Sequence, residues 1–255
     1  MKTESIQQIK ATLATIDKRD DERVQLWQTD ERSGVQQALA QWDRRIQRHE
    51  KELALFEEMQ QFENNARAKG HRLIVGIDEV GRGPLAGPVV AAAVILPENF
   101  QLLGVNDSKK LSAKKRDELY GEIQNQAISI GIGMVDHNKI DEINIYQASK
   151  LAMGIALEDL CFIPDYLLID AMKLDVRIPQ ESIIKGDARS ISIAAASIVA
   201  KVIRDRLMED YAKMYPGYGF ENNAGYGTKE HLLGLDQQGI CTIHRKTFAP
   251  IKDMC

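Results

Sequence analysis

A change of pattern at Gly70 constrains the fold of this chain more than any other feature of its sequence. Before Gly70 the chain contains no proline, and its apolar residues recur at helical spacing. After Gly70, short apolar runs alternate with helical stretches and glycine-rich turns. We therefore expect an N-terminal helical region over residues 1–70 and a separate α/β domain over residues 71–255.

The N-terminal region contains two helical patterns separated by a polar break at residues 20–22. Apolar residues recur over Ile6–Ile16, and a longer pattern over Val35–Phe56 alternates spacings of four and three, close to a heptad period. Two helices with a short break predict a helical hairpin. The arginines within residues 44–48 could contact phosphates, but the glutamates around them favour an ordinary solvated helix face.

Five short apolar runs after Gly70 have the length of strands. The run at residues 128–134 alternates strictly, as a half-buried strand does. The first two runs follow each other through a short link, which indicates an antiparallel start, and the later ones are joined by crossovers. The result is an α/β fold with a mixed five-stranded sheet flanked by helices, and a helical C-terminal portion. The runs are Leu73–Ile77, Val89–Leu96, Ile128–Met134, Tyr166–Ile169 and Ser182–Ile184, and the helical stretches are Lys114–Gln126, Ile145–Leu160, Ser190–Met214 and Lys229–Gln237.

Acidic residues stand where three of these strands end. Asp78 and Glu79 follow the first run, Asp170 closes the fourth, and Asp187 lies just after the fifth. Ligands of α/β sheets bind beyond strand ends, so the four carboxylates could converge. An all-oxygen set suits Mg²⁺ or Mn²⁺ and does not suit zinc.

Two observations weigh against this site when each acid is taken alone. Strand alternation sends Asp78 and Glu79 to opposite faces, so Glu79 would have to reach the site from the strand end. Asp187 could instead cap the following helix, while the other acids end their strands in solvent. Taken together, and with a glycine-rich loop beside them, the acids favour a site.

The glycine-rich loop spans Gly81–Pro88. It is not a dinucleotide-binding fingerprint, because a strand follows it, and it is not a P-loop, because no Gly-Lys-Ser/Thr follows. Gly81 and Gly83 permit close backbone approach to a ligand, and Arg82 offers a forked cation for a phosphate. A tight link between two strands is the simpler interpretation, and the two are compatible.

Two further clusters carry polar or aromatic groups. Ser108, Lys109 and Lys110 supply donors suited to phosphate oxygens, although Ser108 or Ser112 could merely cap a helix. Among the aromatic residues of the glycine-rich segment 215–228, we expect Tyr226 to stack on a base or sugar. We expect Tyr218 and Phe220 to hold that segment to the core.

Composition and absent motifs exclude several classes of protein. The formal net charge of −4 excludes a strongly basic coat, although a local groove or a bound cation can still attract nucleic acid. The three cysteines form no CxxC pair, which favours a reducing compartment. No apolar run could span a bilayer, so we expect a soluble, cytoplasmic protein without a membrane partner. The sequence contains neither HExxH nor Gly-x-Ser-x-Gly.

Taken in order, these segments resemble the bacterial type 2 ribonucleases H, the ribonuclease HII family. The resemblance covers residues 72–250, and residues 1–70 lie outside it as an accessory region. It implies a ribonuclease H-like fold. The segments that carry it are Gly76–Val89, Asp107–Leu111, Leu168–Asp170, Lys185–Asp187, Ser190–Lys201 and Gly225–Thr228.

The resemblance implies a metal-dependent endoribonuclease. Asp78, Glu79, Asp170 and Asp187 would hold two Mg²⁺ or Mn²⁺ ions, which activate the attacking water and stabilise the leaving 3′-oxygen. Asp78 would bridge the two ions. The implied reaction hydrolyses the RNA strand of an RNA/DNA hybrid and leaves 5′-phosphate and 3′-hydroxyl ends.

The resemblance also implies how the substrate is chosen. The loop of Gly81, Arg82 and Gly83 would read the 2′-hydroxyl at an RNA–DNA junction, and Tyr226 would stack on the neighbouring sugar. The enzyme could then cut on the 5′ side of a single ribonucleotide in duplex DNA and so help to remove it. The implied substrate-binding set is completed by Ser108, Lys109, Lys110 and Ser190.

Two other functions stay open on the sequence alone. The chain could be a nucleic-acid-binding module without activity, which the intact set of four carboxylates disfavours. It could be a Mg²⁺-dependent phosphohydrolase of small phosphate esters, which the extended polar loops and the missing P-loop disfavour. The sequence names no protein partner.

Overall fold

The structure is a computed structural model that describes residues 4–254. Its contacts divide the chain into two compact units between Glu57 and Glu58. The division lies near the end of a long helix, whereas the change from helix to sheet lies at Gly70, as the sequence indicates. No described helix is both long and apolar enough to cross a membrane.

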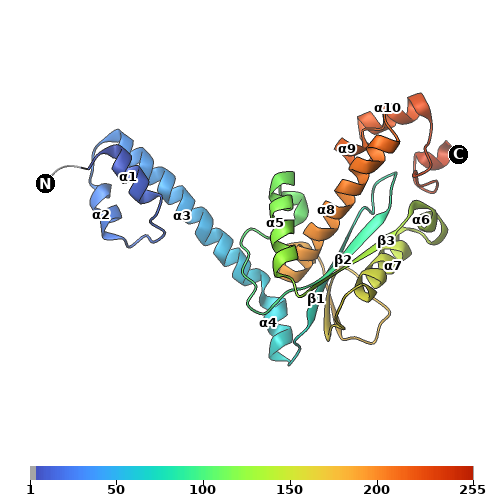
Figure 1. The fold of residues 1–255 in the computed structure, drawn as a ribbon, viewed down its shortest axis with the longest axis horizontal. Coiled ribbons are helices and arrows are strands. Elements are labelled where there is room, and N and C mark those ends of the chain that lie inside the picture. Colours follow the sequence, from blue (N-terminus) through green and yellow to red (C-terminus); the bar gives the residue numbers. More distant parts are fainter. Residues whose placement is uncertain (1–3, 255) are drawn as a thin grey trace. The chain divides into compact units, whose positions relative to one another are not determined.

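The elements follow in chain order (Figure 1). The α-helices are α1 (Ile6–Leu13), α2 (Glu22–Gln28), α3 (Ser33–Met59), α4 (Gln61–Ala68), α5 (Ala113–Gln126), α6 (His137–Ile143), α7 (Ile145–Glu158), α8 (Ile191–Met214), α9 (Phe220–Asn223) and α10 (Lys229–Gln238). The strands are β1 (Ile74–Val80), β2 (Val89–Ile95), β3 (Ser129–Val135), β4 (Tyr166–Asp170) and β5 (Gln180–Ile183). Short 3₁₀ turns are η1 (Ser108–Lys110), η2 (Gly186–Ala188) and η3 (Ile251–Asp253).

The first unit is built from three helices and not from the predicted hairpin of two. The heptad pattern forms one continuous helix, α3, as expected. The predicted polar break instead begins α2, because Asp21 accepts a hydrogen bond from the N–H of Arg23 and caps a helix of seven residues. A helix this short shows too few apolar repeats to be recognised. The shared core of the three helices consists of Ile9, Leu13, Ile16, Val24, Trp27, Val35, Ala38, Leu39, Trp42 and Ile46.

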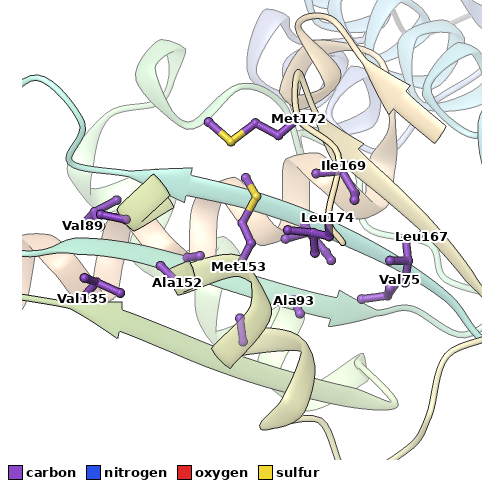
Figure 2. Packing of buried hydrophobic residues seen from close by; sticks show 14 of the residues in the cluster. Val75, Val89, Ala93, Val135, Ala152, Met153, Leu167, Ile169, Met172 and Leu174 are labelled. Carbon is purple, nitrogen blue, oxygen red and sulfur yellow. The ribbon is translucent and has the colours of Figure 1, made fainter. Parts of the chain in front are cut away.

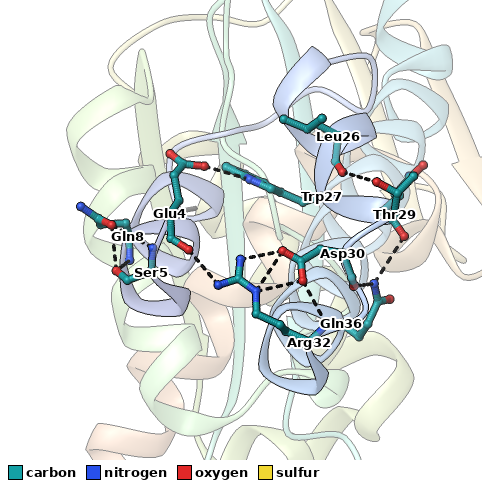
Figure 3. A network of polar contacts seen from close by, with 10 residues as sticks. Glu4, Ser5, Gln8, Leu26, Trp27, Thr29, Asp30, Arg32 and Gln36 are labelled. Atoms are coloured by element: carbon teal, nitrogen blue, oxygen red, sulfur yellow. Dashed lines mark hydrogen bonds and ion pairs between the residues drawn. The ribbon is translucent and has the colours of Figure 1, made fainter. Parts of the chain in front are cut away.

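Polar contacts hold the connections of this unit in place (Figure 3). The indole Nε1 of Trp27 donates to Glu4 Oε2 at 3.0 Å, and Arg32 donates to the Glu4 carbonyl at 2.9 Å. In the basic stretch of α3, Arg45 donates to Asp17 at 2.8 Å and to the Ile16 carbonyl at 2.5 Å. Arg45 is therefore used inside the unit, which supports the ordinary interpretation of that stretch.

The second unit is built on a mixed five-stranded sheet of order β3-β2-β1-β4-β5. The pairs β1–β2 and β2–β3 are antiparallel, and the pairs β1–β4 and β4–β5 are parallel. The five predicted runs are all strands, and the antiparallel start with later parallel strands is confirmed. The parallel strands β1, β4 and β5 therefore direct their carboxyl ends to the same edge of the sheet.

Alternation along β1 assigns its two faces to different helices. Val75 and Ile77 join the core formed with α7, shown in Figure 2. Gly76 faces the start of α8, where a Cβ atom would lie 2.1 Å from the carbonyl carbon of Ser192. On β3, Gly131 and Gly133 meet the α7 backbone in the same way. Glycine is needed at these positions because helix backbone lies directly on the strands.

The start of α8 is fixed by a buried carboxylate of α4. Glu63 accepts hydrogen bonds from Ser190 Oγ at 2.6 Å and from the N–H of Ser192 at 2.9 Å. Burial raises the pKa of Glu63. This acceptor satisfies an N–H group of the first turn of α8, so α4 helps to position the helix that covers β1.

Candidate active site

Asp78 and Glu79 lie within β1, among its last three residues, and not beyond the strand as expected. Their side chains point to opposite faces, as alternation requires. Asp78 is only 6% exposed and lies on the α8 side, where Ser197 of α8 is close enough to lower its pKa. Its Oδ1 also accepts from the N–H of Glu79 at 2.8 Å.

Asp170 and Asp187 approach from the neighbouring parallel strands. Ile77 pairs with Ile169, so the next residues, Asp78 and Asp170, are neighbours across β1 and β4. Asp170 Oδ1 accepts from the N–H of Gly186 at 2.6 Å, which ties β4 to the turn η2. Asp187 lies in η2, directly after β5. The topology thus collects all four acids at one edge of the sheet.

The pKa values of all four acids are raised, first by burial and then by the charges of neighbouring acids. Burial raises the pKa of Asp78 well above its usual value, and the charges of Glu79 and Asp170 raise it further. Burial also raises the pKa of Glu79 to about 7, which Arg82 opposes and Asp170 reinforces. Burial is likewise the main cause of the raised pKa of Asp170 and of Asp187.

The oxygen ligands of these carboxylates suit a hard divalent cation, but they are not arranged in a preformed coordination site. Among residues 4–254, no three His, Cys, Asp or Glu side chains are gathered as a metal-binding group. Glu79 Oε1 lies 3.3 Å from the Arg82 guanidinium, while its buried Oε2 has no hydrogen-bond partner in the described residues. An unpartnered buried oxygen among repelling carboxylates suits a cation such as Mg²⁺ or Mn²⁺.

The predicted donor cluster at Ser108–Lys110 divides into one buried and two surface residues. Ser108 is buried, and its Oγ lies 2.9 Å from the Oγ of Ser197, the α8 residue beside Asp78. Lys109 is close enough for Asp78 and Asp187 to raise its pKa against the lowering effect of burial. Lys110 is exposed, and Ser112 caps α5. Of the three predicted donors, Lys109 is the one whose ammonium group interacts with the acids of the site.

The glycine-arginine loop and Tyr226 lie side by side. A Cβ atom on Gly83 would lie 3.3 Å from Cε1 of the Tyr226 ring, and Tyr226 is 43% exposed. Gly81 has φ +93°, a conformation that favours glycine. Tyr218 and Phe220 are buried and stack on each other, which confirms that they hold this segment to the core.

Ser190 does not lie with these surface groups. Its side chain is buried, donates to Glu63 and accepts from the N–H of Ile193, so it is the N-cap of α8. The alternative that Asp187 caps this helix is therefore excluded. A direct substrate contact by Ser190 stays a prediction that this geometry does not support.

Sequence reasoning missed four residues around the site. Ser197 was recognisable as a polar residue in an otherwise apolar helical run, and Asp107, whose charge helps to raise the pKa of Asp187, stands inside the donor cluster. Arg204 and Arg245 are fully buried beneath the glycine-arginine loop. Nothing in the sequence distinguishes these two arginines from surface ones.

Two buried histidines support the backbone of Tyr226. The Nε2 atoms of His231 and His244 lie 2.9 Å apart, and His244 Nδ1 accepts from the N–H of Cys241 at 2.8 Å. His244 therefore carries its proton on Nε2 and donates to His231, whose Nδ1 donates to the Tyr226 carbonyl at 2.9 Å. Both rings are neutral in this chain of hydrogen bonds.

We expect this histidine pair to lose its contribution to stability as the pH falls. Burial lowers the pKa of His231, and burial with repulsion from His231 lowers the pKa of His244 to about 4. In the unfolded chain these histidines bind a proton below about pH 6.5, whereas in the folded chain they stay neutral until the pH approaches 4. The neutral pair therefore contributes its full stability above about pH 6.5, and this contribution is lost as the pH falls toward 4. Urea unfolding should therefore show that the stability difference between the native chain and His244→Asn shrinks from pH 7 to pH 4.5. The exposed His49, changed to Gln, is the control, and an unchanged difference for His244→Asn would contradict the neutral pair.

Both parts of the chain match family models. The Ribonuclease HII model matches residues 75–251, and the Ribonuclease HII N-terminal domain model matches residues 5–67. The N-terminal match corrects the expectation that the family resemblance begins near residue 72. The chain is 70% identical over 254 residues to a protein named Ribonuclease HII from Enterococcus faecalis, covering 100% of both chains.

Solved structures share the fold of the second unit. The ribonuclease H2 of Pyrococcus horikoshii superposes with a TM-score of 0.60 at 26% identity, over 71% of this chain and 96% of that one. Bst-RNase HIII, solved in complex with Mn²⁺, superposes with a TM-score of 0.54 at 19% identity, over 72% of this chain and 69% of that one. The latter likeness concerns the fold alone.

Proposed function

The chain belongs to the ribonuclease HII family and is a ribonuclease H endoribonuclease, and from this premise we propose how its residues act. Its substrate class is the RNA strand of an RNA/DNA hybrid. We propose that Asp78, Glu79, Asp170 and Asp187 hold divalent cations. We also propose that the enzyme cuts 5′ of a single ribonucleotide embedded in duplex DNA. The products would carry 5′-phosphate and 3′-hydroxyl ends.

One observation supports the metal proposal most strongly. Three buried or half-buried carboxylates, those of Asp78, Glu79 and Asp170, repel one another at the end of two parallel strands. Like charges in a buried site are stabilised when a cation lies between them. When bound, Mg²⁺ or Mn²⁺ would activate the attacking water and stabilise the leaving oxygen.

The residues of this chain have separate tasks in the proposal. Ser197 and the N–H of Glu79 orient the Asp78 carboxylate, and the N–H of Gly186 orients Asp170. Lys109 carries a positive charge between the acids and the surface, where it can attract a phosphodiester. Glycines in the loop after β1 let the backbone approach the substrate ribose.

Selection of a single ribonucleotide is assigned to the loop of Gly81, Arg82 and Gly83 with Tyr226. The 2′-hydroxyl is the group that distinguishes RNA from DNA, so a backbone that approaches it closely can read it. The exposed Tyr226 ring beside Gly83 offers a flat surface for the adjoining sugar or base. Such selectivity suits the removal of misincorporated ribonucleotides from DNA. The free thiols of Cys161 and Cys241 support the reducing cytoplasm as its place.

Changing Tyr226 to Ala tests this assignment. We expect the variant to lose about tenfold in kcat/KM on a duplex with one ribonucleotide, because a stacking contact contributes about 1–3 kcal/mol. On a long RNA/DNA hybrid the loss in kcat/KM should be smaller, since the enzyme can bind and cut at many positions along the RNA strand. Tyr226→Phe, which keeps the ring, serves as the control. Equal losses on both substrates would remove Tyr226 from the reading role.

A labelled duplex with one ribonucleotide tests the whole proposal. Incubation with Mg²⁺ or Mn²⁺ should give one cut on the 5′ side of that nucleotide, and a chelator should abolish it. Binding without cutting would instead indicate a module that only binds nucleic acid. Neither binding nor cutting would point to a small phosphate ester as substrate.

A further inference from the structure

Two arginines beneath the glycine-arginine loop are buried without carboxylate partners. Arg204 and Arg245 are both 0% exposed. In the part of the chain that the structure describes, neither forms an ion pair with a carboxylate. The guanidinium carbon of Arg245 lies over the ring of Phe248, 5.0 Å from its centroid. A buried cation without a counter-charge is costly, so these positions require a reason.

Burial lowers the pKa of both guanidinium groups. It lowers the pKa of Arg204 to about 10 and the pKa of Arg245 to about 9, the latter with a further contribution from the charge of Arg204. Two guanidinium groups that repel each other are therefore kept side by side. Neighbouring acidic side chains, among them Asp205 for Arg204 and Asp141 for Arg245, oppose this lowering of the pKa without forming an ion pair. The direct contacts described for the two groups are with backbone carbonyls and, for Arg245, with the ring of Phe248.

Those acceptors are six backbone carbonyls, and five of them belong to the loop. Arg204 donates to the carbonyls of Pro88, Ala224 and Ala86 at 2.9, 2.8 and 3.2 Å. Arg245 donates to the carbonyls of Gly87, Arg82 and Gly81 at 2.9, 3.0 and 2.6 Å. Within the loop, Arg204 thus binds only residues near the start of β2, whereas Arg245 also binds the first two residues after β1.

The contacts of Arg245 determine where two N–H groups point. In a trans peptide the carbonyl and the following N–H point in opposite directions. When the Gly81 and Arg82 carbonyls turn inward to Arg245, the N–H groups of Arg82 and Gly83 turn away from it. Among the described residues these two N–H groups donate to no protein acceptor. They lie in exposed residues next to the Tyr226 ring.

We propose that Arg245 is a positioning residue that sets the specificity for ribonucleotides, because it holds the peptides after Gly81 and Arg82 with their N–H groups directed at the substrate ribose. This inference rests on the proposed function and deepens it. Arg245 reaches the three carbonyls from three different nitrogens, Nε, Nη1 and Nη2. A lysine ammonium also has three N–H donors, but they all radiate from one nitrogen, so lysine does not reproduce this planar fork.

The test measures a ratio of affinities. In an Asp78→Asn background, fluorescence anisotropy gives the Kd for a duplex carrying one ribonucleotide and for the same duplex made entirely of DNA. Adding Arg245→Lys should reduce the preference for the ribonucleotide about tenfold, as expected for misplaced hydrogen-bond donors. The matched control is Arg204→Lys, which is equally buried and also loses contacts to three carbonyls, but not those of Gly81 and Arg82. It should change the ratio much less.

Each outcome decides between the explanations. An unchanged ratio in Arg245→Lys, or an equal fall in Arg204→Lys, would overturn the positioning role. If the Asp78→Asn protein itself shows no preference for the ribonucleotide, the proposed reading of the 2′-hydroxyl fails instead. Should Arg245→Lys not fold in a thermal scan, the smaller uncharged Arg245→Gln takes its place.

A second measurement does not depend on changing Arg245. Amide hydrogen exchange in the Asp78→Asn protein should slow at Arg82 and Gly83 when the ribonucleotide-containing duplex is bound, and slow less with the all-DNA duplex. Equal exchange in the two complexes would overturn the proposal, because the N–H groups held by Arg245 would then not distinguish the two substrates.

Discussion

Asp78→Asn is expected to lower cleavage of an RNA/DNA hybrid by about a thousandfold or more, because a metal-bound carboxylate supports several kcal/mol of transition-state stabilisation. Affinity for the duplex should stay nearly unchanged, since Asp78 is buried beneath the surface that would contact phosphates. Single-turnover cleavage and anisotropy on the same protein measure both quantities.

The same variant separates a chemical effect from unfolding. In metal-free protein the substitution removes a buried carboxylate that Glu79 and Asp170 repel, so the melting temperature should stay the same or rise. Asp175→Asn, at an exposed position, is the matched control and should cleave normally. A fully active Asp78→Asn would contradict the metal assignment, and a strongly destabilised one would mean that the loss of activity is structural.

Gly76→Ala is expected to have the largest effect on stability. Its Cβ would lie 2.1 Å from the Ser192 carbonyl carbon and 2.3 Å from the Ser192 oxygen, both backbone atoms. The start of α8 cannot easily move aside, because Glu63 binds Ser190 and Ser192 there. Overpacking of this kind costs about 3 kcal/mol or more, which corresponds to a fall of roughly 10 °C in melting temperature.

The control is a Gly→Ala substitution at a position where the added Cβ atom meets no other atom. Gly121 lies in α5 with nothing within 4 Å of the Cβ position, so Gly121→Ala should leave stability unchanged or raise it by up to about 1 kcal/mol. If α8 shifts in Gly76→Ala, Ser197 moves away from Asp78 and activity should fall as well. A melting temperature equal to that of the native chain would show that β1 and α8 are not packed as described.

The sheet and the edge at which the acids gather were predictable because their signals are local. Alternation in Ile128–Met134 and acids after apolar runs are visible in the sequence, and parallel strands bring such acids together. The length of β1 was not predictable, because Asp78 and Glu79 look like the end of an apolar run and yet remain within the strand. The helix α2 was missed because seven residues carry too few repeats.

The supporting contacts were not predictable, because they join residues far apart in the chain. Five of the six carbonyls that Arg204 and Arg245 bind lie more than a hundred positions away, and every residue has a backbone carbonyl, so its sequence does not reveal which one is bound. Ser190 was expected at the substrate, but the carboxylate of Glu63 and the first turn of α8 take up its hydroxyl. Local pattern indicates which groups can perform chemistry, while their partners emerge only from packing.

Anomalous diffraction from manganese-soaked crystals addresses the carboxylate site most directly. The expected density lies at the edge of the sheet where β1, β4 and β5 end, with oxygens of Asp78, Glu79, Asp170 and Asp187 as its ligands, and it disappears in Asp78→Asn. Manganese bound elsewhere, or the same density in the Asp78→Asn crystal, would contradict the account.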